Sequence, residues 1–287
     1  MIGQAERLIK LRQLEKNKYQ SDDLKVISFT SGKGGTGKTF ISLSIAYILS
    51  TMNRKVLFID ADLNFANSNI LLNIIPKSTI DNFFKGNKLL KDVITEYNSK
   101  LHLIFGESGE SEPLELKDEL VARLFNNLNK LKESYDYIII DTASGGQKGL
   151  INLLSFSDIN VIVTSPEPTA VMDAYVMVKL LNNEKYAGKK FILVNKCSDE
   201  EEGETAFNNI KTASSYFLKD NVEFLGYLNF DEKVFRSITK QEFLIKNDPA
   251  AQICSRLTQL SISLTDIIQL ANIPHSNSNH ITNHSNF

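Results

Sequence analysis

A glycine-rich segment near the start of the chain carries residues that could bind phosphate. Its sequence, G-K-G-G-T-G-K-T, fits the pattern G-x-x-x-x-G-K-[ST]. In this pattern backbone N–H groups surround phosphate oxygens, the lysine Lys38 reaches the β- and γ-phosphates, and the hydroxyl of Thr39 binds Mg²⁺. The residues predicted to bind nucleotide phosphate here are Gly32, Lys33, Gly34, Gly35, Thr36, Gly37, Lys38 and Thr39. Lys33 cannot occupy the place of Lys38 and needs a role of its own.

Two aspartates are suited to hold the magnesium ion of such a site. Asp141 follows the apolar run Tyr137–Ile140, and Asp60 follows a similar run that starts at Val56. A carboxylate at the end of a strand beside a phosphate site can hold Mg²⁺ directly or through water. We therefore predict a metal site made by Thr39, Asp60 and Asp141.

Hydrolysis of a nucleotide also requires a group that orients a water molecule in line with the γ-phosphate. Asp62 lies two residues after Asp60, and alternate residues of a strand face the same way, so both carboxylates could converge on the nucleotide. We predict Lys38 and Asp62 as catalytic residues, with Asp62 as the water-orienting group. Farther along, the amide of Asn195 could donate to and accept from an adenine edge.

Short apolar runs separated by helical stretches must position these residues. The runs are Val26–Thr30, Val56–Asp60, Leu101–Phe105, Tyr137–Asp141, Ile159–Thr164, Phe191–Asn195 and Val222–Leu228. Helix candidates between them include Asp118–Lys132, Thr169–Asn182 and Ala206–Leu218. This alternation predicts an α/β fold with a mostly parallel, twisted sheet of about seven or eight strands and helices on both faces. Ligands of such sheets bind at the carboxyl ends of the strands, where the phosphate segment, Asp60, Asp141 and Asn195 all fall.

The composition is that of an ordinary water-soluble globular chain. Of 287 residues 42% are hydrophobic, and the net charge of −2 provides no overall attraction to nucleic acid or anionic membrane. Cys197 and Cys254 lack metal-type spacing, which indicates reduced thiols. No apolar stretch reaches the about 20 residues that span a bilayer. These features predict a cytoplasmic protein.

The two ends of the chain differ from its middle. We predict a helix and linker over residues 1–23, a nucleotide-binding domain over residues 24–272 and a disordered polar tail over residues 273–287. The tail holds three of the four histidines and has no lysine or arginine. The segment Ile253–Ile273 is amphipathic, and its apolar stripe could pack on the sheet or contact membrane.

Together these motifs resemble the deviant Walker A ATPases of the MinD/ParA group, which have a P-loop NTPase fold. The resemblance rests on K-G-G-T-G-K-T at Lys33–Thr39, D-A-D at Asp60–Asp62, and the apolar run that ends at Asp141. It implies ATP or ADP and Mg²⁺ as cofactors, and slow hydrolysis activated in an ATP-dependent homodimer. In that dimer Lys33 would reach the phosphates of the partner subunit, which makes it a third catalytic residue. The resemblance also implies Asp62 as the water-orienting residue and Asn195 as an adenine contact.

Within this group the chain is most similar to the FlhG (YlxH) subfamily, which regulates flagellar number and placement. Gln4–Leu8 resembles the segment with which these proteins stimulate the GTPase FlhF, and Thr164–Ala170, followed by Asp173–Tyr175, resembles a run of the subfamily. This likeness implies Gln4, Ala5 and Leu8 as partner-binding residues. It also implies an FlhF-type GTPase and proteins of the flagellar C-ring and basal body as partners, and a peripheral position at the cell pole or inner membrane.

Some features depart from the MinD/ParA pattern and leave an alternative open. The loop after Asp141 lacks a proline, Asn229 stands where the group usually has proline, and the tail cannot form the basic membrane-binding helix of MinD. The alternative is a partitioning or division-site ATPase that binds DNA or membrane. DNA binding requires basic residues gathered on one face, and the last third of the chain offers only scattered ones, so we predict no DNA partner.

Overall fold

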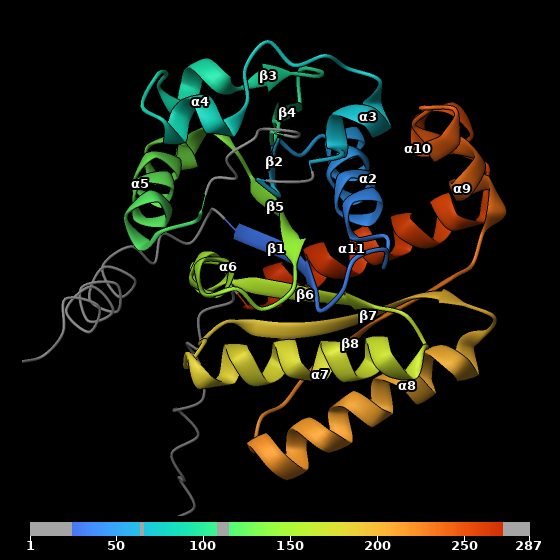
Figure 1. Cartoon of the computed structure of the whole chain (residues 1–287). Helices are drawn as coiled ribbons and strands as arrows, with labels where there is room; N and C mark the ends of the chain where they lie inside the picture. Colours follow the sequence, from blue (N-terminus) through green and yellow to red (C-terminus); the bar gives the residue numbers. More distant parts are fainter. Residues whose placement is uncertain (1–24, 64–65, 108–114, 272–287) are drawn as a thin grey trace, which may run out of the picture.

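An eight-stranded sheet forms the centre of the molecule (Figure 1). The computed structural model describes residues 25–63, 66–107 and 115–271. In spatial order the strands are β3 (Thr95–Glu96), β4 (Leu101–Ile104), β2 (Val56–Ala61), β5 (Tyr137–Ser144), β1 (Lys25–Ser31), β6 (Ile159–Thr164), β7 (Lys189–Cys197) and β8 (Glu223–Asn229). Only the β3–β4 pair is antiparallel among the described strands. The predicted α/β class and mostly parallel sheet are confirmed.

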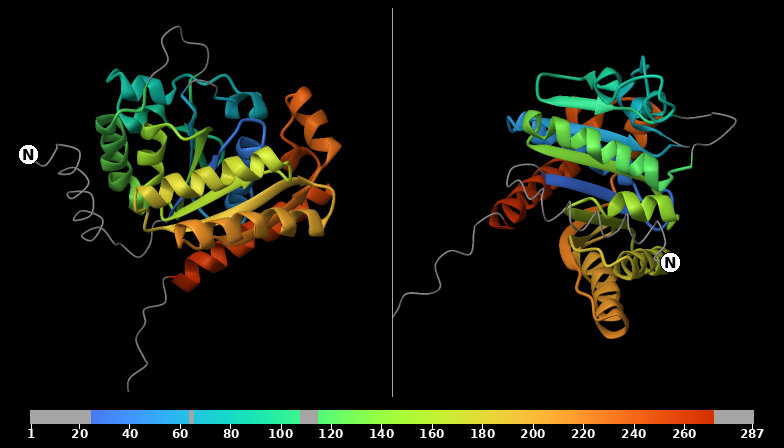
Figure 2. Two further views of the ribbon diagram at one scale, coloured as in Figure 1. Left: turned by 60° about the horizontal axis from the view of Figure 1, so that its bottom comes forward. Right: turned by 90° about the vertical axis from the view of Figure 1, so that its left-hand side faces the viewer.

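Helices cover both faces of the sheet. One face carries α2 (Lys38–Thr51), α3 (Ser68–Leu72), α9 (Glu232–Thr239), α10 (Leu244–Asn247) and α11 (Gln252–Ala271). The other carries α4 (Ile80–Phe84), α5 (Asp118–Leu128), α6 (Lys148–Leu154), α7 (Pro168–Asn183) and α8 (Glu200–Ala213). Figure 2 shows α7 and α8 side by side, with the red α11 on the opposite face. This double cover explains why β2 and β6 are buried along their whole length.

The apolar stripe of α11 packs on the sheet. Its residues Leu257, Leu260, Leu264 and Ile268 are buried in the same core as α2 and the strands. The amphipathic pattern left open whether this stripe packs on the sheet or contacts membrane, and the structure shows these side chains packed on the sheet. Within the described ranges, no helix is long and apolar enough to cross a membrane.

Several element boundaries differ from the predicted ones for local reasons. The helix predicted to end at Lys132 ends at Leu128 and continues as a 3₁₀ helix, η2 (Asn129–Ser134). The helix predicted from Ala206 begins at Glu200, because the Asp199 side chain accepts a hydrogen bond from the Glu202 N–H and caps it. It ends in a π-helical turn, η3 (Ser214–Leu218).

Other elements were not predicted at all. The two-residue strand β3 and the short helices α3, α4, α9, α10 and η1 (Leu90–Val93) are too brief to show periodicity. The predicted N-terminal helix and the polar tail lie outside the described residues, so the predicted division at residues 23 and 272 stays a prediction.

Candidate functional site

The phosphate loop, Gly32–Thr39, joins β1 to α2 at the carboxyl edge of the sheet. Gly35 and Gly37 have φ values of +79° and +88°, a left-handed conformation that favours glycine. Gly32 has a different role: a Cβ there would lie 2.5 Å from the backbone of Asp173, so only glycine lets α7 approach the loop this closely. Since α2 begins at Lys38, the loop brings its N–H groups to a helix N-terminus, where anions bind.

Lys38 lies against the predicted metal site. Its Nζ is 3.1 Å from Asp141 Oδ1, and both side chains are buried. Asp141 lies directly opposite Asp60 in the parallel pairing of β5 with β2. Asp60 lies in β2, Asp141 lies in β5, and Lys38 follows β1. The fold therefore brings the two predicted carboxylates and the phosphate-loop lysine together from three separate parts of the chain. Asp141 lies inside β5, which continues to Ser144, and so does not end its strand as predicted.

Asp60 is fully buried and held by local hydrogen bonds. Ser68 donates to Asp60 Oδ2 through its N–H at 3.2 Å and through its hydroxyl at 2.6 Å. The N–H of Asp62 donates to Oδ1 at 3.2 Å. Burial, reinforced by the charge of Asp141, raises the pKa of Asp60 to about 6, although the bonds from Ser68 and the charge of Lys38 oppose this rise.

These residues fit a divalent cation. Within the described part of the chain, no group donates a hydrogen bond to Asp141 Oδ2, which is buried. A buried carboxylate oxygen without a partner is unfavourable, and a cation or its bound water would satisfy it. Mg²⁺ commonly binds through one or two carboxylates together with substrate phosphates. Asp141, Asp60 and Thr39, which lies in the first turn of α2, are the residues suited to hold it.

The raised pKa of Asp60 predicts that Asp60→Asn stabilises the metal-free protein above neutral pH. The ordinary pKa of 3.8 applies to the unfolded chain, so the wild type loses stability as the pH rises from about 4 through about 6. Above that pH the loss is complete, and it amounts to about 3 kcal/mol at 1.4 kcal/mol per pKa unit. Urea unfolding with a chelator at pH 4.5 and pH 7.5 should show the advantage of the variant growing with pH. Asp266→Asn, an exposed change on α11, is the control; an advantage that does not change with pH would contradict the prediction.

Lys33 is bound by residues of its own chain. Its Nζ forms an ion pair with Glu167 and donates to Thr169 Oγ1 at 3.3 Å. The hydrogen bond from Lys33, together with its charge, holds the pKa of Glu167 below its ordinary value. A third of the Lys33 side chain remains exposed. In this arrangement Lys33 lies beside the start of α7 and is separate from the buried pair of Lys38 and Asp141.

Asn195 and Lys196 lie at the carboxyl end of β7 and contact the phosphate loop. Asn195 Nδ2 donates to the carbonyl oxygen of Thr36 at 2.8 Å, and Lys196 Nζ donates to that of Gly35 at 2.7 Å. The structure thus brings Asn195 to the loop, while its contact with adenine stays a prediction. Asp62 lies just after the end of β2, as predicted, and its part in orienting water also stays a prediction.

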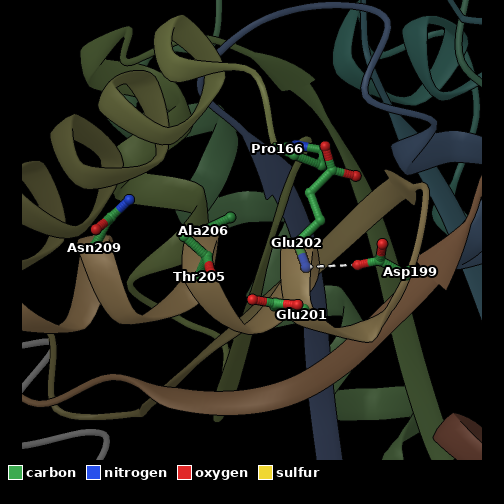
Figure 3. Close-up of a pocket in the computed structure, with 7 residues that line it drawn as sticks. All are labelled: Pro166, Asp199, Glu201, Glu202, Thr205, Ala206 and Asn209. Carbon is green, nitrogen blue, oxygen red and sulfur yellow. Dashed lines mark hydrogen bonds between the residues drawn. The ribbon is translucent and has the colours of Figure 1, made fainter.

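Two cavities lie near this edge of the sheet. One, of about 290 Å³, is lined by Pro166, by Asp199, which caps α8, and by the first turns of that helix, including Glu201 and Glu202 (Figure 3). Its carboxylates would repel the phosphates of a nucleotide. The other, of about 600 Å³, lies where β8 ends, beside Asn229, and its lining includes the acidic residues Asp231 and Glu232 as well as the cationic residues Lys233 and Arg256. β8 is the neighbour of the strand that carries Asn195, so this cavity is the better placed of the two for the nucleoside.

Three contacts of the site were missed at the sequence level. They are the bonds of Ser68 to Asp60, of Glu167 to Lys33, and of Lys196 to the phosphate loop. Glu167 lies in the run Thr164–Ala170, whose only signal in the sequence is its resemblance to a run of the subfamily. Gln4, Ala5 and Leu8, the predicted partner-binding residues, lie outside the described residues.

Comparisons with known proteins agree with this geometry. A family model described as an AAA domain matches residues 24–192. The antiactivator FleN of Pseudomonas aeruginosa is 28% identical over 229 residues, which cover 80% of this chain and 82% of FleN. The flagellum site-determining protein YlxH of Helicobacter pylori is 31% identical over 270 residues, which cover 92% of this chain and 91% of YlxH.

Solved structures share the fold. The septum site-determining protein MinD of Pyrococcus horikoshii, complexed with Mg-ADP, matches 86% of this chain and 98% of its own with a TM-score of 0.70 at 22% identity. A ParA family ATPase from Chlorobium tepidum matches 85% of this chain and all of its own, again with a TM-score of 0.70, at 21% identity. These likenesses establish the MinD/ParA architecture of the sheet and its helices.

Proposed function

Because the chain belongs to the FlhG (YlxH) group of MinD/ParA-type P-loop ATPases, we propose that it is an ATP-driven dimerising switch that regulates flagellar number or placement. The observation that carries the proposal is the phosphate loop with two lysines in different surroundings. Lys38 is buried beside Asp141, whereas Lys33 is held at the surface by Glu167. Such a difference suits one lysine that acts on the nucleotide of its own subunit and another that acts elsewhere.

Each residue of the site has a defined part in ATP hydrolysis. The loop N–H groups and Lys38 bind the β- and γ-phosphates, and Asp62 orients the attacking water. Magnesium, held by Thr39, Asp60 and Asp141, would supply positive charge that neutralises the phosphate oxygens. The base and ribose extend toward the end of β7, near Asn195, and toward the cavity beside Asn229.

The dimer completes the site. In the ATP-bound state Lys33 leaves Glu167 and reaches the phosphates of the partner subunit, in the manner of an arginine finger supplied in trans. Charge on the transferring phosphoryl group is then stabilised only after two subunits have met. This requirement makes hydrolysis slow in the monomer and links it to assembly.

The partners follow from the subfamily. FleN is named as an antiactivator and YlxH as flagellum site-determining. By this likeness we assign to the chain an FlhF-type GTPase and proteins of the flagellar C-ring and basal body as partners, with Gln4, Ala5 and Leu8 as the contact to the GTPase. The protein would act in the cytoplasm, at the cell pole or the inner membrane.

Deletion of residues 1–20 tests this assignment. We expect the shortened protein to bind ATP and dimerise as the full chain does, because the described site begins only at β1. Stimulation of the GTP turnover of an FlhF-type partner should be lost, because the deletion removes Gln4, Ala5 and Leu8. Turnover of GTP by the partner is measured with each form of the protein.

The full-length variant Gln4→Ala/Leu8→Ala serves as a second probe that leaves the chain length unchanged. Stimulation that is equal for all three forms would show that the N-terminal segment does not activate the partner. Failure of the full chain to bind ATP or to hydrolyse it would overturn the proposed function as a whole.

A further inference from the structure

Two successive side chains of β7 hold two successive carbonyl groups of the phosphate loop. Asn195 Nδ2 donates to Thr36 O at 2.8 Å, and Lys196 Nζ donates to Gly35 O at 2.7 Å. We propose that Asn195 and Lys196 form a tether, a pair of positioning residues that sets the direction of the loop N–H groups before nucleotide arrives. This inference concerns the nucleotide site of the proposed function and rests on it.

The planarity of the peptide bond explains why holding a carbonyl matters. In a trans peptide the C=O of one residue and the N–H of the next point in opposite directions. Holding the carbonyls of Gly35 and Thr36 toward β7 therefore turns the N–H groups of Thr36 and Gly37 away from it. These N–H groups belong to the set that binds phosphate in such loops.

The loop needs such a restraint because of its composition. Gly34, Gly35 and Gly37 give it more backbone freedom than any other run of the chain of this length, and that freedom must be lost for the N–H groups to converge. The Asn195 side chain also packs closely against the loop. A Cβ on Gly37 would lie 2.5 Å from Asn195 Nδ2, so the glycine leaves the space that the Asn195 amide fills.

The two members of the tether have different surroundings. Asn195 is buried, so its amide gains most from a fixed acceptor. Lys196 is exposed and adopts a φ of +65°, which is unfavourable for a residue with a side chain and places this lysine on the loop. The charge of Lys196 also acts on Glu167, the partner of Lys33. The tether thus borders the site of the second lysine.

A tether and an adenine contact predict different losses of ligand affinity when Asn195 is replaced. A residue that acts on the base matters only for ligands that carry a base. A residue that acts on the loop matters for every ligand that carries phosphates, including inorganic tripolyphosphate. The ratio of the affinities for ATP and tripolyphosphate therefore separates the two roles.

We test the tether by calorimetric titration of the full-length protein with ATP and with tripolyphosphate. Asn195→Ala should lower the affinity for both ligands by the same factor, about fivefold, which corresponds to the usual contribution of one hydrogen bond. Lys196→Met should lower both affinities about tenfold, because the hydrogen bond from Lys196 to the Gly35 carbonyl is charge-assisted. Lys189→Met is the matched control, since it removes an exposed lysine at the opposite end of the same strand. It should leave both affinities unchanged.

Hydrogen exchange separates positioning from simple attraction between Lys196 and phosphate. In the nucleotide-free protein the amides of residues 34–37 should exchange faster in Asn195→Ala and Lys196→Met than in the wild type or in Lys189→Met. Exposed Lys196 can be replaced without opening the core, so this measurement decides the matter even if Asn195→Ala folds poorly. The tether is wrong if exchange in the loop is unchanged, or if Asn195→Ala weakens ATP alone. A wild type that binds neither ligand would instead overturn the proposed function, and the exchange data would still judge the tether.

Discussion

Lys33→Ala should abolish ATP-dependent dimerisation and lower ATP turnover at least about 100-fold, while ATP affinity stays near that of the wild type. Binding survives because Lys38, its partner Asp141 and the loop N–H groups are untouched. Turnover should fall because, in the proposed dimer, the charge that stabilises the transferring phosphoryl group comes from the partner's Lys33 and is lost in both sites. Light scattering with Mg-ATP and phosphate release measure the two effects, and fluorescent nucleotide titration measures binding.

Two comparison variants make this result specific. Lys179→Ala removes an exposed lysine farther along α7 and should change none of the three quantities. Glu167→Gln should act in the opposite direction to Lys33→Ala, because it frees Lys33 from its ion pair without removing it. We expect its ATP-bound form to dimerise at about two- to fivefold lower protein concentration, the modest effect of an exposed pair. Lys33→Ala protein that still dimerises and turns over ATP would exclude a role for Lys33 in trans.

Asp62→Ala should stop turnover but trap the dimer. Without a carboxylate to orient the attacking water we expect ATP hydrolysis to fall by about 10²–10⁴-fold, the usual contribution of such a group. The bonds that hold ATP and Lys33 do not involve this side chain in our scheme, so the dimer should form with Mg-ATP and persist. Light scattering over hours, together with phosphate release, follows both properties.

Replacing Asp60, which lies two residues before Asp62, should give a different result and so serves as a comparison. Asp60→Ala removes a buried carboxylate of the proposed magnesium site and should weaken Mg-ATP binding itself, so that no dimer accumulates. Asp92→Ala, an exposed change in η1, is the neutral control. If Asp62→Ala hydrolyses ATP at the wild-type rate, another group must orient the water, and the role assigned to Asp62 is wrong.

Much of the site could be predicted because its chemistry is local in the chain. The phosphate loop is one continuous run in which glycine spacing, Lys38 and Thr39 together define a binding site. Asp60 and Asp141 could be predicted because each follows a buried apolar run, and parallel strands bring their carboxyl ends to the same edge. That the two are direct neighbours depends on the strand order, in which β2 lies beside β5. The order of strands has no local signal in these runs.

What the sequence determined by itself was therefore the fold class, the phosphate-loop motif and the carboxylates that lie beside it, since periodicity and motif spacing act within short stretches of chain. The tertiary structure alone decided that Lys33 is paired with Glu167, that Asn195 and Lys196 hold the loop carbonyls, and that the stripe of α11 faces the sheet. Glu167 lies 134 residues from Lys33, and Asn195 lies 159 from Thr36. Apolar periodicity shows that a face of a helix is buried, but it does not show which element covers that face. The sequence around a polar side chain likewise does not indicate which distant residue it will contact. Packing of the whole chain supplies both.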